Sequence, residues 1–357
     1  MVELVQLPVP DALDGPGGSD FVAGIDIRNI VEAHAFGSWD LQCDPAEQLP
    51  HYQDEGRPQR MILARRDGTW VGRARYELEP TGDTAWVNVE VLPAHRGRGV
   101  GRALADEAEG TVAAAGCRKV IAYVPIRPEP GPQLPAPTGA GSVPRLSRDV
   151  RFLLARGYRL EQVERVSRLT LPLPRLAARL AEAVARSGPE YLTHTWVGPT
   201  PGRWIAGMAD LRTRLSTDVP TAGLEEPTLE WTAEQIREAD TRLSRHPHRR
   251  LTAVVEHRPA RCLVGFSQLA VPPQPGRAAV QEATLVSREH RGHGLGLLVK
   301  LASVAALADT APQTPSITTF NAEENSAMLT VNTALGYRPI ACQSGWRKDL
   351  PSGRQRR

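Results

Sequence analysis

The chain has 357 residues, of which 41% are hydrophobic and 23% are charged, which excludes a fully disordered chain. At about 150 residues per domain, this length predicts two globular domains. The formal net charge is only +3, from 43 basic and 40 acidic residues, which argues against a dedicated nucleic-acid-binding protein with a clustered basic face. There is neither a signal peptide nor a run of about 18 apolar residues, so we expect a cytoplasmic protein with no membrane span.

The four cysteines, Cys43, Cys117, Cys262 and Cys342, are far apart and form no CxxC pattern. We therefore expect reduced thiols and no metal site. Of the 43 basic residues only three are lysine, and alanine, glycine and proline are abundant. This composition is typical of a GC-rich genome such as that of an actinobacterium.

In the first half, apolar periodicity predicts a short strand, an amphipathic helix, an antiparallel meander, and then a helix and a buried strand. These elements are strand 2–8, helix 21–36, strands 60–66, 70–78 and 84–92, helix 99–115 and strand 119–124. The insert 125–144 contains seven prolines, so we expect an exposed, semi-extended loop. It is interpreted as a tolerated surface insertion or as a lid or partner-binding arm. Helix 146–156 and a closing hairpin of strands 158–164 and 166–171 complete this half.

The second half repeats this order of elements. They are linking helix 174–186, strand 191–197, helices 203–215 and 232–244, strands 251–257, 262–270 and 280–286, helix 294–307, strand 316–320, helix 323–334 and two C-terminal strands. We therefore expect an N-terminal domain over 1–173, a linker with its helix over 174–190, and a C-terminal domain over 191–357.

The clearest evidence for a duplicated fold is a glycine-rich turn that occurs twice. Arg96–Gly101 reads RGRGVG and Arg291–Gly296 reads RGHGLG, 195 positions later. Downstream, Gly157-Tyr158 corresponds to Gly336-Tyr337 at an offset of 179. One fold written twice predicts a monomeric pseudo-dimer, with a homodimer as the alternative.

A strand that leads into a glycine-rich turn and a helix is a typical anion site, because free backbone N–H groups and the helix dipole meet there. The turns are not P-loops, since no GK[ST] follows, and they are not dinucleotide fingerprints, since their glycines alternate. A helix merely capped by glycines is the alternative explanation for one such turn. Two copies in the same context favour a phosphate site.

Both halves resemble the Gcn5-related N-acetyltransferase (GNAT) family, whose phosphate motif [QR]-x-x-G-x-[GA] both turns fit. The segment from Asn321 to Tyr337, N-x-x-x-N-x-x-M-x-x-x-N-x-x-L-G-[FY], resembles tandem GNAT proteins of actinobacteria. The resemblance implies an α/β fold (α+β mixed sheet) of two tandem GNAT folds. Each would be a mostly antiparallel sheet with splayed fourth and fifth strands and flanking helices.

The resemblance also implies acetyl-CoA (CoA) as co-substrate and no metal. The pyrophosphate would lie on the turn, and the pantetheine arm would pair with main-chain groups between the splayed strands. Asn325 would face the pantetheine or the acetyl end. The implied cofactor-binding residues are Val89, Val91, Arg96, Gly97, Arg98, Gly99, Val100, Gly101, Thr284, Val286, Arg291, Gly292, His293, Gly294, Leu295, Gly296, Asn321 and Asn325.

Acetyl transfer needs a base for the ammonium, and it benefits from an acid for the departing thiolate. The family's acid is often a tyrosine four residues before the Gly-aromatic glycine, a position occupied here by Leu153 and Asn332. Asn332 can donate a hydrogen bond and Leu153 cannot. Glu282 is the candidate base, with a solvated carboxylate as the alternative, so we expect the second half to be catalytic. The first half would be a structural partner that is still able to hold CoA.

The leading hypothesis is an N-acetyltransferase that moves acetyl from acetyl-CoA to a primary amine of a small molecule by direct attack in a ternary complex. The acceptor would be an antibiotic, an amino sugar or a related metabolite, with Asp218 among the acidic loop residues attracting the amine. An alternative is an acyltransferase that uses another acyl-CoA or a carrier-protein donor. A second alternative is a tandem GNAT that binds CoA or a partner without turnover. We expect no nucleic-acid or membrane partner.

Overall fold

The computed structural model describes residues 2–79 and 82–351, which form two compact units. Unit 1 contains the described residues of Met1–Glu164, Ala222–Glu225 and Ala341–Arg357. Unit 2 contains Arg165–Thr221 and Glu226–Ile340. These bounds differ from the expected domains, because two segments of the range 191–357 belong to unit 1.

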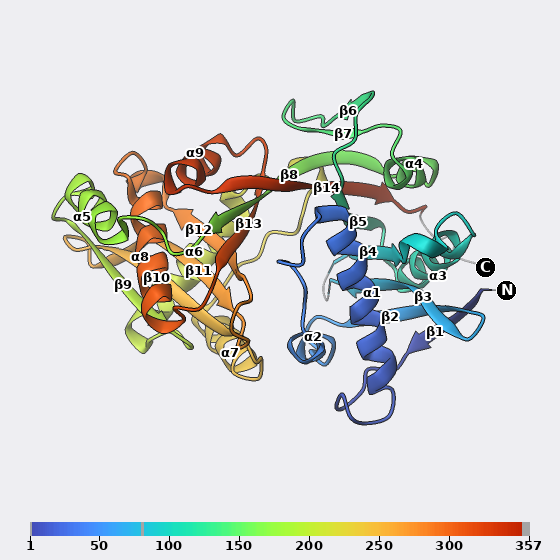
Figure 1. Ribbon diagram of the computed structural model, residues 1–357. Helices are drawn as coiled ribbons and strands as arrows, with labels where there is room; N and C mark the ends of the chain where they lie inside the picture. The colour runs from blue at the N-terminus through green and yellow to red at the C-terminus, as the bar shows by residue number, and fades with distance from the viewer. Residues whose placement is uncertain (1, 80–81, 352–357) are drawn as a thin grey trace. The chain divides into compact units, whose positions relative to one another are not determined.

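Unit 1 is a mostly antiparallel sheet with helices on both faces. Its elements are β1 (Glu3–Leu7), α1 (Gly18–Phe36), α2 (Pro45–Tyr52), β2 (Gln59–Arg66), β3 (Thr69–Leu78), β4 (Thr84–Val91), η1 (Pro93–His95), α3 (Val100–Ala114), β5 (Lys119–Ile126), β6 (Gln133–Pro135), β7 (Ser142–Pro144), α4 (Arg148–Ala155), the start of β8 (Arg159–Thr170), η3 (Ala222–Leu224) and the end of β14 (Arg338–Asp349). Its strand order includes β1-β2-β3-β4-β5-β14, in which only β4 and β5 are parallel. In Figure 1 the red strand β14 runs beside β5.

Alternating residues of β2 show how the sheet of unit 1 builds a core on each face. Ile62 and Ala64 pack in the cluster that contains Leu104 of α3. Met61 and Leu63 point to the other face, in the cluster that contains helices α1 and α2. Because successive side chains of a strand alternate between faces, the continuous apolar run of β2 serves both layers.

Unit 2 repeats this arrangement. Its elements are the end of β8, α5 (Leu176–Ser187), β9 (Tyr191–Val197), η2 (Gly202–Trp204), α6 (Ile205–Asp218), α7 (Ala233–Leu243), β10 (Arg249–His257), β11 (Cys262–Val271), β12 (Ala279–Val286), η4 (Arg288–His290), α8 (Leu295–Thr310), β13 (Ser316–Ala322), α9 (Ser326–Leu335) and the start of β14. The order β13-β12-β11-β10-β9 is antiparallel except between β12 and β13. In β10, Ala253 and Val255 pack in the cluster of α8, whereas Val254 packs in the cluster of α6 and α7.

The expected closing hairpins are wrong, because each is one continuous strand, β8 and β14. No turn residue separates the two strands predicted at 158–164 and 166–171. Gly345 within β14 is not a turn residue either. A Cβ there would lie 2.9 Å from Leu224 Cδ1, so the close packing of unit 1 leaves little space for a side chain at this position.

The proline-rich insert is more ordered than expected. Strands β6 and β7 form a short antiparallel hairpin within it, with Leu134 opposite Val143. Val143 and Ala136 are buried in the core of unit 1, together with Val150 of α4. The expectation of an exposed, semi-extended loop is therefore wrong for the β6–β7 hairpin and for its buried residues Ala136 and Val143, whereas most other residues of the segment are exposed or half-buried. Within residues 2–79 and 82–351, no helix is long and apolar enough to cross a membrane.

Candidate functional site

Strands β4 and β5 of unit 1 pair only at their beginnings and then separate. The parallel register runs from Thr84–Lys119 to Trp86–Ile121 and stops there. Beyond this point the Asn88 side chain spans the gap, and its Nδ2 donates to the Tyr123 carbonyl oxygen across 2.6 Å. The separation leaves main-chain groups of both strands available to a ligand.

A pocket of about 1030 Å³ occupies this gap. Its walls are Val87–Val91 of β4, Ala122–Pro125 of β5, and parts of α1, α3 and α4. Gly97, Gly99 and Gly101 of the glycine-rich turn also line it. The pocket thus joins the splayed strands to the predicted phosphate site, and its volume is at the upper end of small-ligand pockets.

The glycine turn of unit 1 is open. Gly97 and Gly99 have φ angles of 76° and 84°, a left-handed conformation that favours glycine. No atom lies within 4 Å of the position that a Cβ would take on Gly99. On Gly97 that position is 3.9 Å from Arg148 Nη1, so a guanidinium stands beside the turn. Backbone N–H groups, the start of α3 and this cation together suit an anion.

The turn of unit 2 has the same backbone, with φ angles of 90° at Gly292 and 73° at Gly294. The motif arginine makes the same hydrogen bond in both copies. Arg96 Nε donates to the Val91 carbonyl oxygen across 3.0 Å, and Arg291 Nε donates to that of Val286 across 3.2 Å. This arginine therefore fixes the turn to the end of the preceding strand.

The chain itself occupies the surroundings of the unit 2 turn. Asp218, expected to attract a cationic amine, instead pairs with Arg288 and Arg291, each across 2.9 Å. A Cβ on Gly294 would lie 3.4 Å from Arg186 Cδ at the end of α5. The unit 2 turn is thus more enclosed than the unit 1 turn.

Strands β12 and β13 of unit 2 also separate, after Gln281–Thr319. Glu282 is the first residue of β12 beyond this point, and its Oε2 lies 3.1 Å from Arg250 Nε. Thr284, also on β12, shares a hydrogen bond of 3.2 Å with Ser267. Asn325 begins α9, where its Oδ1 accepts a hydrogen bond from the Met328 N–H across 3.2 Å.

Asn332, which occupies the position of the family's acid, is buried and forms a polar chain with the buried Lys300 and the half-buried Asn321. Lys300 Nζ donates to Asn332 Oδ1 across 2.8 Å, and Asn332 Nδ2 donates to Asn321 Oδ1 across 2.6 Å. Burial lowers the pKa of Lys300 to about 7. Sequence reasoning missed this lysine, although a lysine within an otherwise apolar helix of a lysine-poor chain was a visible signal.

Sequence reasoning also missed two carboxylates in the unit 1 pocket wall. Glu90 of β4 accepts hydrogen bonds from the buried Arg73 guanidinium across 3.2 and 3.3 Å. Glu32 of α1 pairs with Arg28 across 2.6 Å, an i,i+4 spacing that the sequence does show. Desolvation in the pocket wall raises the pKa of Glu32, and the nearby Glu90 charge acts in the same direction.

At another part of the pocket wall, Glu109 of α3 receives hydrogen bonds from three side chains, those of Arg156, Tyr158 and Lys348. Burial alone would raise the pKa of Glu109, but the hydrogen bonds from Arg156 and Lys348 outweigh it and lower that pKa. The Glu109 carboxylate is therefore ionised at neutral pH, and its three hydrogen bonds hold it in place.

The comparisons with known proteins agree with this geometry. Residues 26–127, which contain β4, the glycine turn and β5 of unit 1, match the Acetyltransferase (GNAT) family. No curated protein sequence is similar enough to count as a match.

Among solved structures, the chain is similar to a tandem GNAT protein from the clavulanic acid biosynthesis pathway. The identity is 23%, the coverage is 99% of this chain and 100% of that one, and the TM-score is 0.75. It is also similar to a GCN5-related N-acetyltransferase from Sphaerobacter thermophilus, at 16% identity, 98% and 95% coverage and a TM-score of 0.65. A third similar structure is Saccharomyces cerevisiae N-myristoyltransferase with bound myristoyl-CoA, at 12% identity, 97% and 78% coverage and a TM-score of 0.56. The chain is therefore a tandem GNAT-fold protein whose residues 26–127 match the acetyltransferase (GNAT) family.

Proposed function

We propose that the protein is an N-acetyltransferase that moves acetyl from acetyl-CoA to a primary amine of a small molecule. The single observation that carries this proposal is the pocket of about 1030 Å³ in unit 1, which joins the open glycine turn to the splayed edges of β4 and β5. A CoA molecule needs both features, an anion site for its pyrophosphate and exposed strand edges for its pantetheine amides.

The donor would lie along unit 1. The pyrophosphate would meet the backbone N–H groups from Arg98 to Gly101, with the Arg148 guanidinium beside them. The pantetheine amides would pair with main-chain groups of Val89 and Val91, where β4 no longer pairs with β5. The thioester would then lie near the start of the splay, toward the wall formed by α1.

The reaction is direct attack of the amine nitrogen on the thioester carbonyl carbon in a ternary complex. A C–N bond forms, the C–S bond breaks, and CoA leaves as the thiolate. The nitrogen must first lose a proton, since an ammonium cannot attack. Glu32 supports this step better than Glu90 does, because desolvation brings its pKa closer to neutral pH and Arg73 holds the Glu90 carboxylate.

For unit 2, catalysis by Glu282 and Asn332 with CoA at Arg291–Gly296 stays a prediction. Glu282 does lie at the first splayed position of β12, equivalent to Val87 of β4. Against it stand the ion pair of Glu282 with Arg250 and the buried hydrogen bonds of Asn332. We therefore favour unit 1 as the donor site.

The acceptor is proposed to be an antibiotic, an amino sugar or a related metabolite, which would place the protein in antibiotic biosynthesis or resistance. The support is a shared fold with a tandem GNAT protein from the clavulanic acid biosynthesis pathway.

The test is release of CoA thiol when the full chain is incubated with acetyl-CoA and a panel of primary amines. Acetylated amine detected by mass spectrometry in equal amount to the released thiol would support the proposal. CoA binding by calorimetry without turnover of any amine would favour a non-catalytic binding protein instead.

A further inference from the structure

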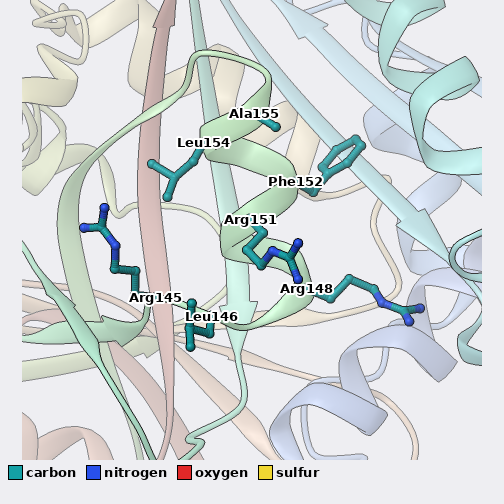
Figure 2. A pocket seen from close by; sticks show the side chains of 7 residues that line it. All are labelled: Arg145, Leu146, Arg148, Arg151, Phe152, Leu154 and Ala155. Atoms are coloured by element: carbon teal, nitrogen blue, oxygen red, sulfur yellow. The ribbon is translucent and has the colours of Figure 1, made fainter.

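A hollow of about 530 Å³ lies at the surface of unit 1, and it is lined by side chains of helix α4 and of the residues just before it. Its lining residues are Arg145, Leu146, Arg148, Arg151, Phe152, Leu154 and Ala155. Figure 2 shows Arg148 and Phe152 on one side of α4, Leu154 and Arg145 toward the other, and Arg151 between them. The hollow therefore presents guanidinium groups and apolar side chains together.

The three arginines of the hollow are exposed, and none forms an ion pair with another described residue. Nearby Arg156 differs, since it pairs with Asp106 and Glu109. Unpaired guanidinium groups concentrate positive potential and suit bidentate contacts with carboxylates or phosphates. The hollow thus has a net attraction for an anionic partner.

The hollow adjoins the phosphate end of the donor pocket. Arg148, Phe152 and Ala155 line both cavities. Arg148 also stands beside Gly97 of the glycine turn. Arg145 and Arg151 line only the hollow, so they extend the positive surface beyond the pocket itself.

The second copy of the fold lacks this surface. At the offset of 179 that relates Gly157-Tyr158 to Gly336-Tyr337, Arg145 corresponds to Glu324, Arg148 to Ala327 and Arg151 to Thr330. The fold that both units share therefore does not require arginine at these three positions.

A carrier protein presents its acyl group on a pantetheine arm joined through one phosphate to a serine, so its body must lie at the phosphate end of the pocket. Such a partner needs an acidic surface to meet Arg145 and Arg151. It also needs apolar side chains to cover Leu146, which is 65% exposed, and Leu154, which is 38% exposed.

We propose that this hollow is the docking face for an acidic acyl carrier protein, whose phosphopantetheine arm enters the unit 1 pocket and serves as the acyl donor. The inference rests on the proposed function. The pocket carboxylate takes one proton from the ammonium, and the free amine nitrogen attacks the carbonyl carbon of the carrier-bound thioester. A C–N bond forms, the C–S bond breaks, and the pantetheine sulfur leaves as the thiolate. This thiolate takes up the second proton, which the nitrogen loses as the amide forms, so the carrier keeps a free thiol.

The test compares two donors with the full chain, acetyl-CoA and an acetylated bacterial holo-acyl carrier protein, using an amine that the chain acetylates. The variant is Arg145→Glu/Arg151→Glu. The matched control is Arg245→Glu/Arg338→Glu, which makes the same charge change at exposed sites of unit 2. We expect the hollow variant to lower kcat/KM about tenfold or more with the carrier donor, with acetyl-CoA turnover unchanged. The control variant should change neither kcat/KM with the carrier donor nor the turnover of acetyl-CoA.

Added salt should also slow the carrier reaction more than the acetyl-CoA reaction. Transfer from acetyl-CoA but not from the carrier protein would overturn this inference alone, as would an equal loss with both donors in the hollow variant. Failure of both donors with every amine would overturn the proposed function itself.

Discussion

Lys300 Nζ donates a hydrogen bond to Asn332 Oδ1 across 2.8 Å in the interior of unit 2. At the offsets of the two repeats, these residues correspond to Ala105 and Leu153 of unit 1, which both line the pocket of about 1030 Å³. The two copies thus use equivalent positions differently. Unit 1 keeps small or apolar side chains around a cavity, whereas unit 2 has a buried polar pair.

Replacement of this lysine should change the pH dependence of stability. The pKa of Lys300 is about 7 in the folded chain, against 10.5 for a free lysine. Between these values the unfolded state binds more protons than the native state, so this group makes stability rise with pH from about 7 to 10.5. Lys300→Met should remove that rise. Thermal unfolding of the wild type and of Lys300→Met, measured from pH 7 to 10.5, gives the pH dependence of each stability. The same rise with pH in both proteins would refute the lowered pKa of Lys300.

A carboxylate at the phosphate end of the pocket should weaken donor binding. Gly101 lines the pocket and has no positive φ, and a Cβ on it makes only an ordinary contact of 3.6 Å with Val91. Gly101→Glu should therefore fold normally and repel the pyrophosphate, weakening CoA binding at least about tenfold by calorimetry. Gly101→Ala is the steric control and should bind CoA normally.

The equivalent variant Gly296→Glu tests the turn of unit 2. Because unit 1 holds the donor in the proposed function, CoA affinity should be unchanged in this variant. Loss of binding in Gly296→Glu, with normal binding in Gly101→Glu, would move the donor site to unit 2.

Removal of the pocket-wall base should slow the reaction and alter its pH profile. Glu32→Gln should lower kcat about 10²-fold or more, as expected when a general base is lost. Because the pKa of Glu32 is raised, the wild-type rate should fall on the acidic side at a pH above the usual glutamate range. The pH–rate profile of Glu32→Gln should lack this fall on the acidic side. Glu282→Gln is the matched variant in unit 2, and a larger loss there would favour the prediction made from the sequence.

The ion pair between the buried Arg73 and Glu90 of the pocket wall should contribute to the stability of unit 1. Arg73 is 4% exposed and its main partner is Glu90. Arg73→Leu would leave the Glu90 carboxylate without a counter-charge, at a cost of about 3–5 kcal/mol in the free energy of unfolding. The double variant Arg73→Leu/Glu90→Leu should recover much of that loss. Denaturant unfolding measures the free energy of unfolding of the single and the double variant. An equal loss of stability in the two variants would contradict the argument that the unpaired Glu90 carboxylate causes the loss.

Much of the proposed donor site follows from the sequence, because its glycine turn depends on local rules of backbone conformation. Gly97, Gly99, Gly292 and Gly294 adopt the left-handed conformation for which glycine is suited. Helix α2 could also have been predicted, since Asp44 and Glu47 form a capping box with a proline at the first helical position.

The other features of the fold and of the candidate site could not be predicted, because they depend on contacts between residues that are distant in sequence. Nothing near Lys300 in the sequence indicates that its partner is Asn332, 32 positions later. Periodicity likewise predicts that 338–349 is extended, but not that it pairs with β5. The expectation that unit 2 is catalytic, which stays a prediction, rests on the hydrogen-bonding capacity of Asn332, which the sequence shows. The pocket of unit 1, on which the proposed function rests, is visible only in the structure.

The last strand has a consequence for how the chain can be made and divided. Residues 342–349 of β14 pair with β5, and Trp346 lies fully buried in the core of unit 1. During synthesis from the N-terminus, the β5 edge of the unit 1 sheet therefore stays unpaired until residues 342–349 have left the ribosome. A cut at the junction of the two repeats would yield an N-terminal fragment that lacks the end of β14 and with it the buried Trp346. The N-terminal repeat therefore depends on a C-terminal segment for its complete sheet and core, so the two repeats are not separable at their junction.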